Sequence, residues 1–194
     1  MIFKKTIAPA LWLFSIIIGI SSLIFYSNTA GISTSFSRQW PIESSIPRKP
    51  HLPILLIFAH PHCPCTTATL GELERLMPHL QGKSQIFVVF VQSSHHNEAW
   101  IKDDLWNKSN RIPGVQSWID QGGHEADLFE AKTSGQVLLF NAQGDFIFSG
   151  GITSSRGHMG DSRGRAQLLN WFESGIIPTD KTPVFGCSLK KGKK

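Results

Sequence analysis

The chain has 194 residues, of which 41% are hydrophobic and 17% are charged, and its formal net charge at pH 7 is +5. This length is enough for one domain with its own hydrophobic core in addition to a terminal segment. The positive charge forms no basic stripe interleaved with aromatic residues, which argues against nucleic-acid binding. The three cysteines are too few for a small scaffold held together by disulfides.

An apolar segment near the N-terminus predicts a membrane anchor. Residues 7–26 are twenty residues without a charge, and Lys4 and Lys5 precede them. A helix of this length crosses a hydrocarbon core of about 30 Å, and the preceding lysines keep the N-terminus in the cytoplasm. The alternative is a cleaved signal peptide, but the apolar run is long for one and residues 28–30 make a poor cleavage site.

Composition changes along the chain divide it into four parts. The segment after the anchor is rich in Ser, Pro and Gly, and its three prolines interrupt any regular element, as in a linker. The predicted parts are a signal anchor or transmembrane helix (1–27), a linker (28–50), a folded domain (51–178) and a tail that carries Cys187 (179–194).

Apolar runs and helical periodicity predict an α/β domain. The predicted strands are residues 52–59, 85–91, 115–119, 136–140 and 145–149. The predicted helices are residues 66–80, 97–108, 125–131 and 165–174. The last two strands flank a turn in which Gly144 suits a positive φ, as in a hairpin. The order is a βαβ unit, a crossover region, a hairpin and a helix, which predicts a central mixed sheet with helices on both faces.

Two cysteines mark the candidate site. Cys63 and Cys65 lie in His60-Pro-His-Cys-Pro-Cys-Thr66, where the first strand gives way to a helix. The N-terminus of a helix carries a partial positive charge and free N–H groups, and both favour a thiolate over a thiol. A thiolate attacks disulfides or binds soft metals, so the motif indicates thiol redox chemistry or metal handling.

With these motifs in place, most of residues 52–189 resembles the thioredoxin fold. More narrowly, the chain is similar to the RedB-like bacterial proteins, which are membrane-tethered and related to TlpA-type and peroxiredoxin-type domains. The matching motifs are residues 60–70, 133–136, 149–158 and 182–187. The resemblance implies a thiol–disulfide oxidoreductase in the bacterial inner membrane with its domain facing the periplasm. It implies no required cofactor, and its partners would be exported protein thiols or disulfides, or a membrane electron donor.

The resemblance also assigns roles to residues. It places the first cysteine at the tip of the helix, so Cys63 is expected to be an exposed nucleophile and Cys65 its resolving partner. Gly135 falls where thioredoxins have a cis-proline, and a glycine leaves that position open and flexible. The loop after the last strand is expected to border the cysteines. The expected pocket residues are His62, Pro64, Ser134, Gly135, Arg156 and His158.

The spacing of the cysteines leaves their pairing open. One residue separates Cys63 from Cys65, so a disulfide between them is near the upper edge of the allowed geometry and labile. Such a bond predicts an oxidising or isomerising potential. The tail is long enough to bring Cys187 back to either thiol, to add it as a third metal ligand, or to leave it exposed.

The sequence leaves two other functions open. Two thiolates and an imidazole suit copper, so Cys63, Cys65 and His158 form a candidate copper site. This alternative, a copper-binding chaperone, rests on fold-level analogy with Sco-type copper proteins. The third possibility is a redox-inactive adaptor that keeps only the fold.

Overall fold

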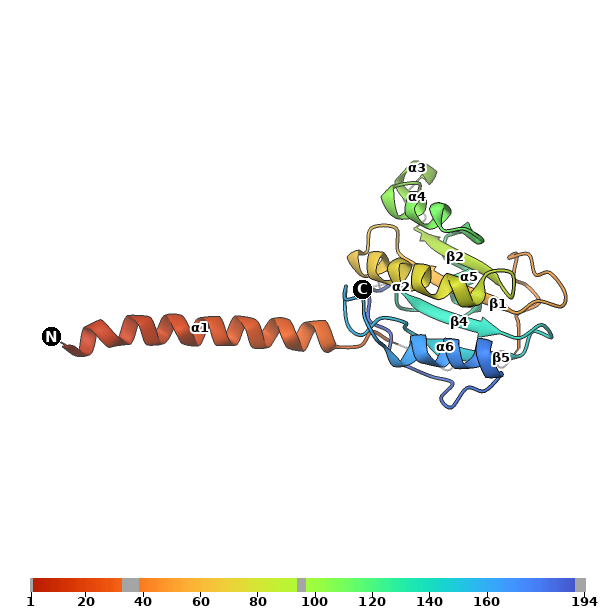
Figure 1. The fold of residues 1–194 in the computed structure, drawn as a ribbon. Helices are drawn as coiled ribbons and strands as arrows, with labels where there is room; N and C mark the ends of the chain where they lie inside the picture. The colour runs from red at the N-terminus through yellow and green to blue at the C-terminus, as the bar shows by residue number, and fades with distance from the viewer. Residues whose placement is uncertain (1, 33–38, 94–96, 191–194) are drawn as a thin grey trace.

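A long helix leads into an α/β domain in the computed structural model, which describes residues 2–32, 39–93 and 97–190 (Figure 1). The long helix is α1 (Ile2–Asn28). The elements of the domain are β1 (Ile54–Ala59), α2 (Pro64–Leu80), β2 (Gln85–Gln92), α3 (Glu98–Ile101), α4 (Asp104–Arg111), β3 (Val115–Gln121), α5 (His124–Leu128), β4 (Gln136–Phe140), β5 (Phe146–Gly150) and α6 (Arg163–Ser174).

The sheet has five strands in the order β3-β2-β1-β4-β5. Strand β1 is parallel to β2, β2 is parallel to β3, and β4 is antiparallel to both β1 and β5. The predicted mixed sheet, with a βαβ unit followed by a hairpin, is therefore confirmed. All six residues of β1 are buried because this strand is central and covered on both faces, as its continuous apolar run indicates.

Alternating residues of β1 divide the core into two halves. Leu55 and Ile57 belong to a cluster with apolar residues of α2, α3, α4 and α6. Leu56 and Phe58 face the other way and pack with Phe129 and residues near α5. Figure 1 shows α2 and α6 side by side on one face of the sheet. The carboxyl end of β1 thus delivers the cysteine motif to the edge of the sheet where α2 begins.

Part of the predicted linker belongs to the folded domain. The ring of Trp40 packs edge-on against Phe129 and Phe140, with centroid distances of 4.9 and 5.3 Å. Ile46 is 3% exposed, and the two serines before it hydrogen-bond to the buried carboxylate of Glu125. Residues 39–50 therefore close the second half of the core, although their prolines prevent a regular element.

The single helix predicted over residues 97–108 is wrong, because the chain forms two short helices there. The break falls at Lys102 and Asp103, and Asp103 has an extended backbone as the N-terminal cap of α4. Aspartate favours this position over a helix interior. The break also lets the Asp103 carboxylate lie 3.4 Å from Nδ1 of His62, beside the cysteine motif.

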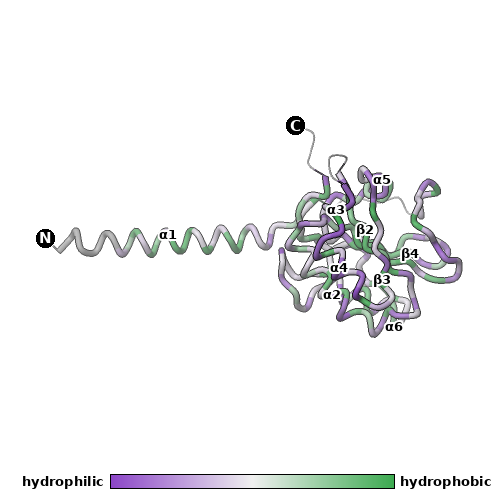
Figure 2. Tube along the Cα trace, turned by 90° about the horizontal axis from the view of Figure 1, so that it is seen from above, coloured by the Kyte–Doolittle hydropathy of each residue, from purple (hydrophilic) through white to green (hydrophobic). Residues whose placement is uncertain are grey.

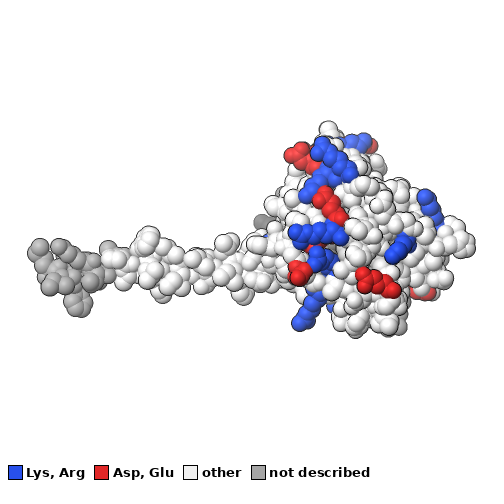
Figure 3. All heavy atoms as spheres, viewed as in Figure 1, with Lys and Arg blue, Asp and Glu red and all other residues white. Residues whose placement is uncertain are grey.

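Helix α1 projects away from the domain. Its segment Pro9–Asn28 is long and apolar enough to cross a membrane, and none of it is buried against the rest of the protein. Figure 2 shows successive apolar turns along this helix, and Figure 3 shows no charged side chain on the part of the helix that it draws in white. An unburied apolar helix of this length is what a membrane anchor requires.

Removal of the Phe129 ring tests the second half of the core. The ring is fully buried and contacts Trp40, Phe58 and Phe140. We expect Phe129→Ala to lower the free energy of unfolding by about 3–5 kcal/mol, because it leaves a cavity under the linker. Urea unfolding of the detergent-solubilised chain, followed by tryptophan fluorescence, measures this. Ile42→Ala is the control and should change little, since Ile42 is 97% exposed.

Candidate functional site

The cysteine motif forms the turn from β1 into α2. Cys63 is the N-terminal cap of α2, with φ −89° and ψ 120°, and Pro64 is the first helical residue. Proline suits that position because its fixed φ matches a helix and its missing N–H would have no helical partner. The N–H of Thr66 donates to the carbonyl of Cys63 at 2.9 Å, which closes the first turn.

Three thiols meet at this helix start. The sulfur atoms of Cys63 and Cys187 are 2.9 Å apart, and Cys65 is close enough for the charge of Cys63 to raise its pKa. Cys63 is 1% exposed and Cys65 is 7% exposed. The expectation of an exposed Cys63 is therefore wrong, because the tail lies against its sulfur. Of the pairings left open by the sequence, the structure brings Cys187 to Cys63.

The three thiols differ in acidity. Burial opposes ionisation of Cys63, but hydrogen bonds from the Cys187 thiol and from the N–H groups of Cys187, Cys65 and Thr66 outweigh it and lower the pKa of Cys63. Burial, and then the charge of Cys63, raise the pKa of Cys65. Burial and the hydrogen bond to Cys63 raise the pKa of Cys187 to about 12. Cys63 is thus the thiol that ionises first.

Backbone pairing holds the tail beside Cys63. The N–H of Ser134 donates to the carbonyl of Cys187 at 2.8 Å, and the N–H of Leu189 donates to the carbonyl of Lys132 at 2.9 Å. A Cβ atom at Gly186 would lie 1.9 Å from the carbonyl oxygen of Ser134, so only glycine allows this approach. The tail is therefore a docked strand-like segment at the point where it carries Cys187.

The earlier part of the tail is docked as well. The N–H of Gly151, just after β5, donates to the carbonyl of Pro183 at 3.1 Å. The side chain of Val184 is fully buried, and its carbonyl accepts a hydrogen bond of 2.8 Å from the N–H of Gly31. The tail thus bridges the sheet and the segment that follows α1, so its path is fixed on both sides.

Ser134 contacts the cysteine motif, and Gly135 packs against α2. The Ser134 hydroxyl accepts a hydrogen bond from the N–H of His60 and lies 2.9 Å from the Thr66 hydroxyl. Gly135 has φ +89°, and a Cβ atom there would lie 2.9 Å from Oγ1 of Thr69. The expectation of an open Gly135 is wrong, since α2 packs directly over it.

Arg156 connects the site to the end of α1. Its guanidinium donates to the carbonyl of Gly186 and, at 3.2 Å, to the carbonyl of Thr29. Its backbone N–H donates to the carbonyl of Ser27 at 3.0 Å, and its guanidinium lies 5.0 Å from the ring centre of Tyr26. Its positive charge also acts on Cys65 and Cys187, where it opposes the rise in pKa.

The two predicted pocket histidines interact elsewhere. His158 is exposed, and its Nδ1 lies 2.7 Å from the carbonyl of Arg156. The ring of His62 lies 4.4 Å from that of Trp100 and close to Asp103. Within residues 2–32, 39–93 and 97–190, no group of three or more His, Cys, Asp or Glu side chains is arranged to hold a metal ion. The copper site predicted at Cys63, Cys65 and His158 stays a prediction.

Some contributors to the site were not predicted from the sequence. Thr66 and Gly186 support the motif and the tail, and the backbone of residues 27–29 contacts Arg156. A glycine directly before the tail cysteine is a weak signal of close packing. Nothing in the sequence indicates the contacts with residues 27–29, because they arise only when α1 meets the domain.

Comparisons with known proteins place the fold. No family model matches the chain, and no curated protein matches it. An uncharacterised protein from Geobacillus kaustophilus has a TM-score of 0.60 at 16% identity, over 87% of this chain and 94% of its own. A hypothetical protein from Sinorhizobium meliloti has a TM-score of 0.63 at 15% identity, over 84% of this chain and 97% of its own.

A third solved structure is less similar. The exposed lipoprotein thioredoxin Etrx1 of Streptococcus pneumoniae has a TM-score of 0.47 at 14% identity, over 63% of this chain and 84% of its own. The βαβ unit followed by a hairpin and a helix, which carried the resemblance to the thioredoxin fold, is present in one mixed sheet. The chain has a thioredoxin-like fold. The narrower resemblance to RedB-like proteins stays a prediction.

The acidity of Cys63 gives a direct test of the site. We expect the ultraviolet absorbance of the Cys63 thiolate in the reduced chain to titrate at a lower pH than that of an ordinary cysteine, because hydrogen bonds lower its pKa. Cys187→Ala should raise that midpoint because it removes a thiol that hydrogen-bonds to the Cys63 thiolate. Cys187→Ser keeps a donor and should raise the midpoint less. Cys65→Ala is the control, and an unchanged midpoint in Cys187→Ala would contradict the described contact.

Proposed function

We propose that the protein is a thiol–disulfide oxidoreductase anchored in the bacterial inner membrane, with Cys63 as its nucleophile and its domain on the periplasmic side. One observation carries the proposal: the Cys63 sulfur lies at the start of α2, with a second thiol 2.9 Å away. The N–H groups of Cys65 and Thr66 stabilise its thiolate. A low-pKa thiolate beside a second thiol is the arrangement that disulfide exchange requires.

The exchange proceeds in two balanced steps. The Cys63 thiolate attacks a disulfide of the partner, which forms a mixed disulfide and releases one partner sulfur as a thiolate. A second thiol of the cluster then loses its proton and attacks the Cys63 sulfur. The other partner sulfur leaves and takes up that proton, so two electrons pass to the partner. The reverse sequence oxidises a partner dithiol, and neither direction needs a bound cofactor.

The position of α1 supports the membrane assignment. Two lysines precede its apolar segment, which favours a cytoplasmic N-terminus and a periplasmic domain. The end of α1 meets the domain at Arg156, which also contacts the tail beside Cys187. The thiols then lie close to the membrane surface. Partners at that surface are the thiols or disulfides of exported proteins and a membrane electron donor.

A redox titration of the detergent-solubilised full chain tests this function. Thiols are trapped by alkylation at each potential in dithiothreitol buffers and counted by mass spectrometry. We expect a reversible two-electron couple that disappears in Cys63→Ser. Ser188→Ala is the control, because that hydroxyl contacts only the tail's own backbone among the described residues, and it should keep the couple. Thiols that stay reduced across the titration would leave a redox-inactive adaptor.

A further inference from the structure

We propose that Cys187, rather than Cys65, is the resolving thiol, and that the oxidised protein carries a disulfide between Cys63 and Cys187. This inference rests on the proposed function and names the second thiol of the exchange. It also assigns a role to the docked tail, residues 180–190, which brings a thiol to Cys63 from 124 positions away in the chain.

The geometry favours Cys187 because the two sulfurs already touch. They are 2.9 Å apart, whereas a disulfide bond is about 2.05 Å long. The sulfurs belong to separate segments, each held by its own backbone hydrogen bonds, so a small approach of the tail is enough to join them. No turn of a helix has to change.

Cys65 is less well placed for the same bond. It is the second residue of α2, and Cys63 is the cap of that helix with Pro64 between them. The proline ring fixes the φ angle of the residue that separates the two cysteines. A bond between them would close a ring across the first turn of α2, where Thr66 N–H already bonds to the Cys63 carbonyl. Forming this disulfide would therefore distort the first turn of α2.

The acidity of Cys187 changes in the right direction during the exchange. Besides burial, the hydrogen bond and charge of Cys63 raise the pKa of Cys187. Once Cys63 is part of a mixed disulfide it carries no charge, so these two contributions disappear. Arg156, which lowers the pKa of Cys187, stays beside it. Cys187 therefore keeps its proton in the resting site and loses it more readily when its attack is needed.

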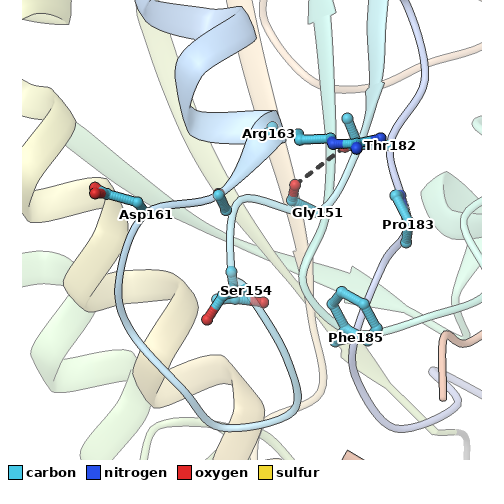
Figure 4. A pocket seen from close by; sticks show the side chains of 10 residues that line it. Gly151, Ser154, Asp161, Arg163, Thr182, Pro183 and Phe185 are labelled. Atoms are coloured by element: carbon cyan, nitrogen blue, oxygen red, sulfur yellow. Dashed lines mark hydrogen bonds between the residues drawn. The ribbon is translucent and has the colours of Figure 1, made fainter. Parts of the chain in front are cut away.

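The tail also covers the nucleophile. Cys63 is 1% exposed, so a partner disulfide reaches it only after the tail has moved. A pocket of about 310 Å³ lies between the tail and the loop from β5 to α6, and Figure 4 shows Thr182, Pro183 and Phe185 on its tail side. The tail segment before Cys187 therefore borders open space on this side.

Disulfide mapping in matched variants tests the inference. The full chain in detergent is oxidised in a dithiothreitol redox buffer and digested with trypsin without reduction. Arg75 and Lys181 lie between Cys63 and Cys187, so this disulfide joins two peptides, whereas one between Cys63 and Cys65 lies within one peptide. We expect the joined peptides in the wild type and in Cys65→Ser, and a reversible couple in both. Cys187→Ser should give neither the joined peptides nor a reversible couple.

A matched control moves the thiol by one residue. The double variant Cys187→Ser with Ser188→Cys keeps a tail thiol but turns it to the other side of a segment that pairs as an antiparallel strand. We expect no joined peptides from it. Gly186→Ala keeps all three thiols but displaces the tail, and should slow formation of the joined peptides and speed alkylation of Cys63 at least tenfold. Unchanged rates would contradict the inference.

The outcomes separate this inference from the proposed function. A disulfide confined to Cys63 and Cys65, with a couple that survives Cys187→Ser, overturns the role of Cys187 and leaves the oxidoreductase intact. The absence of a reversible couple in the wild type overturns both. Far-UV circular dichroism of each variant excludes misfolding as the cause of a lost couple.

Discussion

The contact between the sulfurs of Cys63 and Cys187 is the interaction on which the site depends. Strand β1 brings Cys63 to the edge of the sheet, and the docked tail brings Cys187, which lies 124 positions later in the sequence, to the same point. Gly186 permits the approach because any side chain there would collide with Ser134. The same contact covers Cys63, and the hydrogen bond from Cys187 lowers the pKa of the Cys63 thiol.

Arg156 joins that arrangement to the end of α1. Its guanidinium contacts the tail at Gly186 and the chain after α1 at Thr29, and it lies over the ring of Tyr26. Hydrogen bonds to a charged group contribute about 1.5–3 kcal/mol each, so these contacts hold the end of α1 against the domain more firmly than a flexible linker does. The end of α1 is thus fixed relative to the thiols.

Most of the fold was predictable because its signals are local. The apolar run of β1, the period of α2 and the turn at Gly144 each depend on a few neighbouring residues. The burial of Cys63 and the packing of Gly135 under Thr69 were not predictable, because both depend on segments distant in sequence. The motif marked two of the three clustered thiols, whereas the approach of Cys187 to Cys63 depends on how the tail returns.

Hydrogen exchange of the tail amides measures whether the tail is docked beside Cys63 in the reduced protein. The full chain in detergent is exchanged under reducing conditions, and peptides covering residues 182–190 are followed by mass spectrometry. We expect the Leu189 amide, which donates to the Lys132 carbonyl, to be protected from exchange, and we expect Gly186→Ala to remove this protection. Exchange of the wild-type tail at the rate of an unstructured peptide would contradict it.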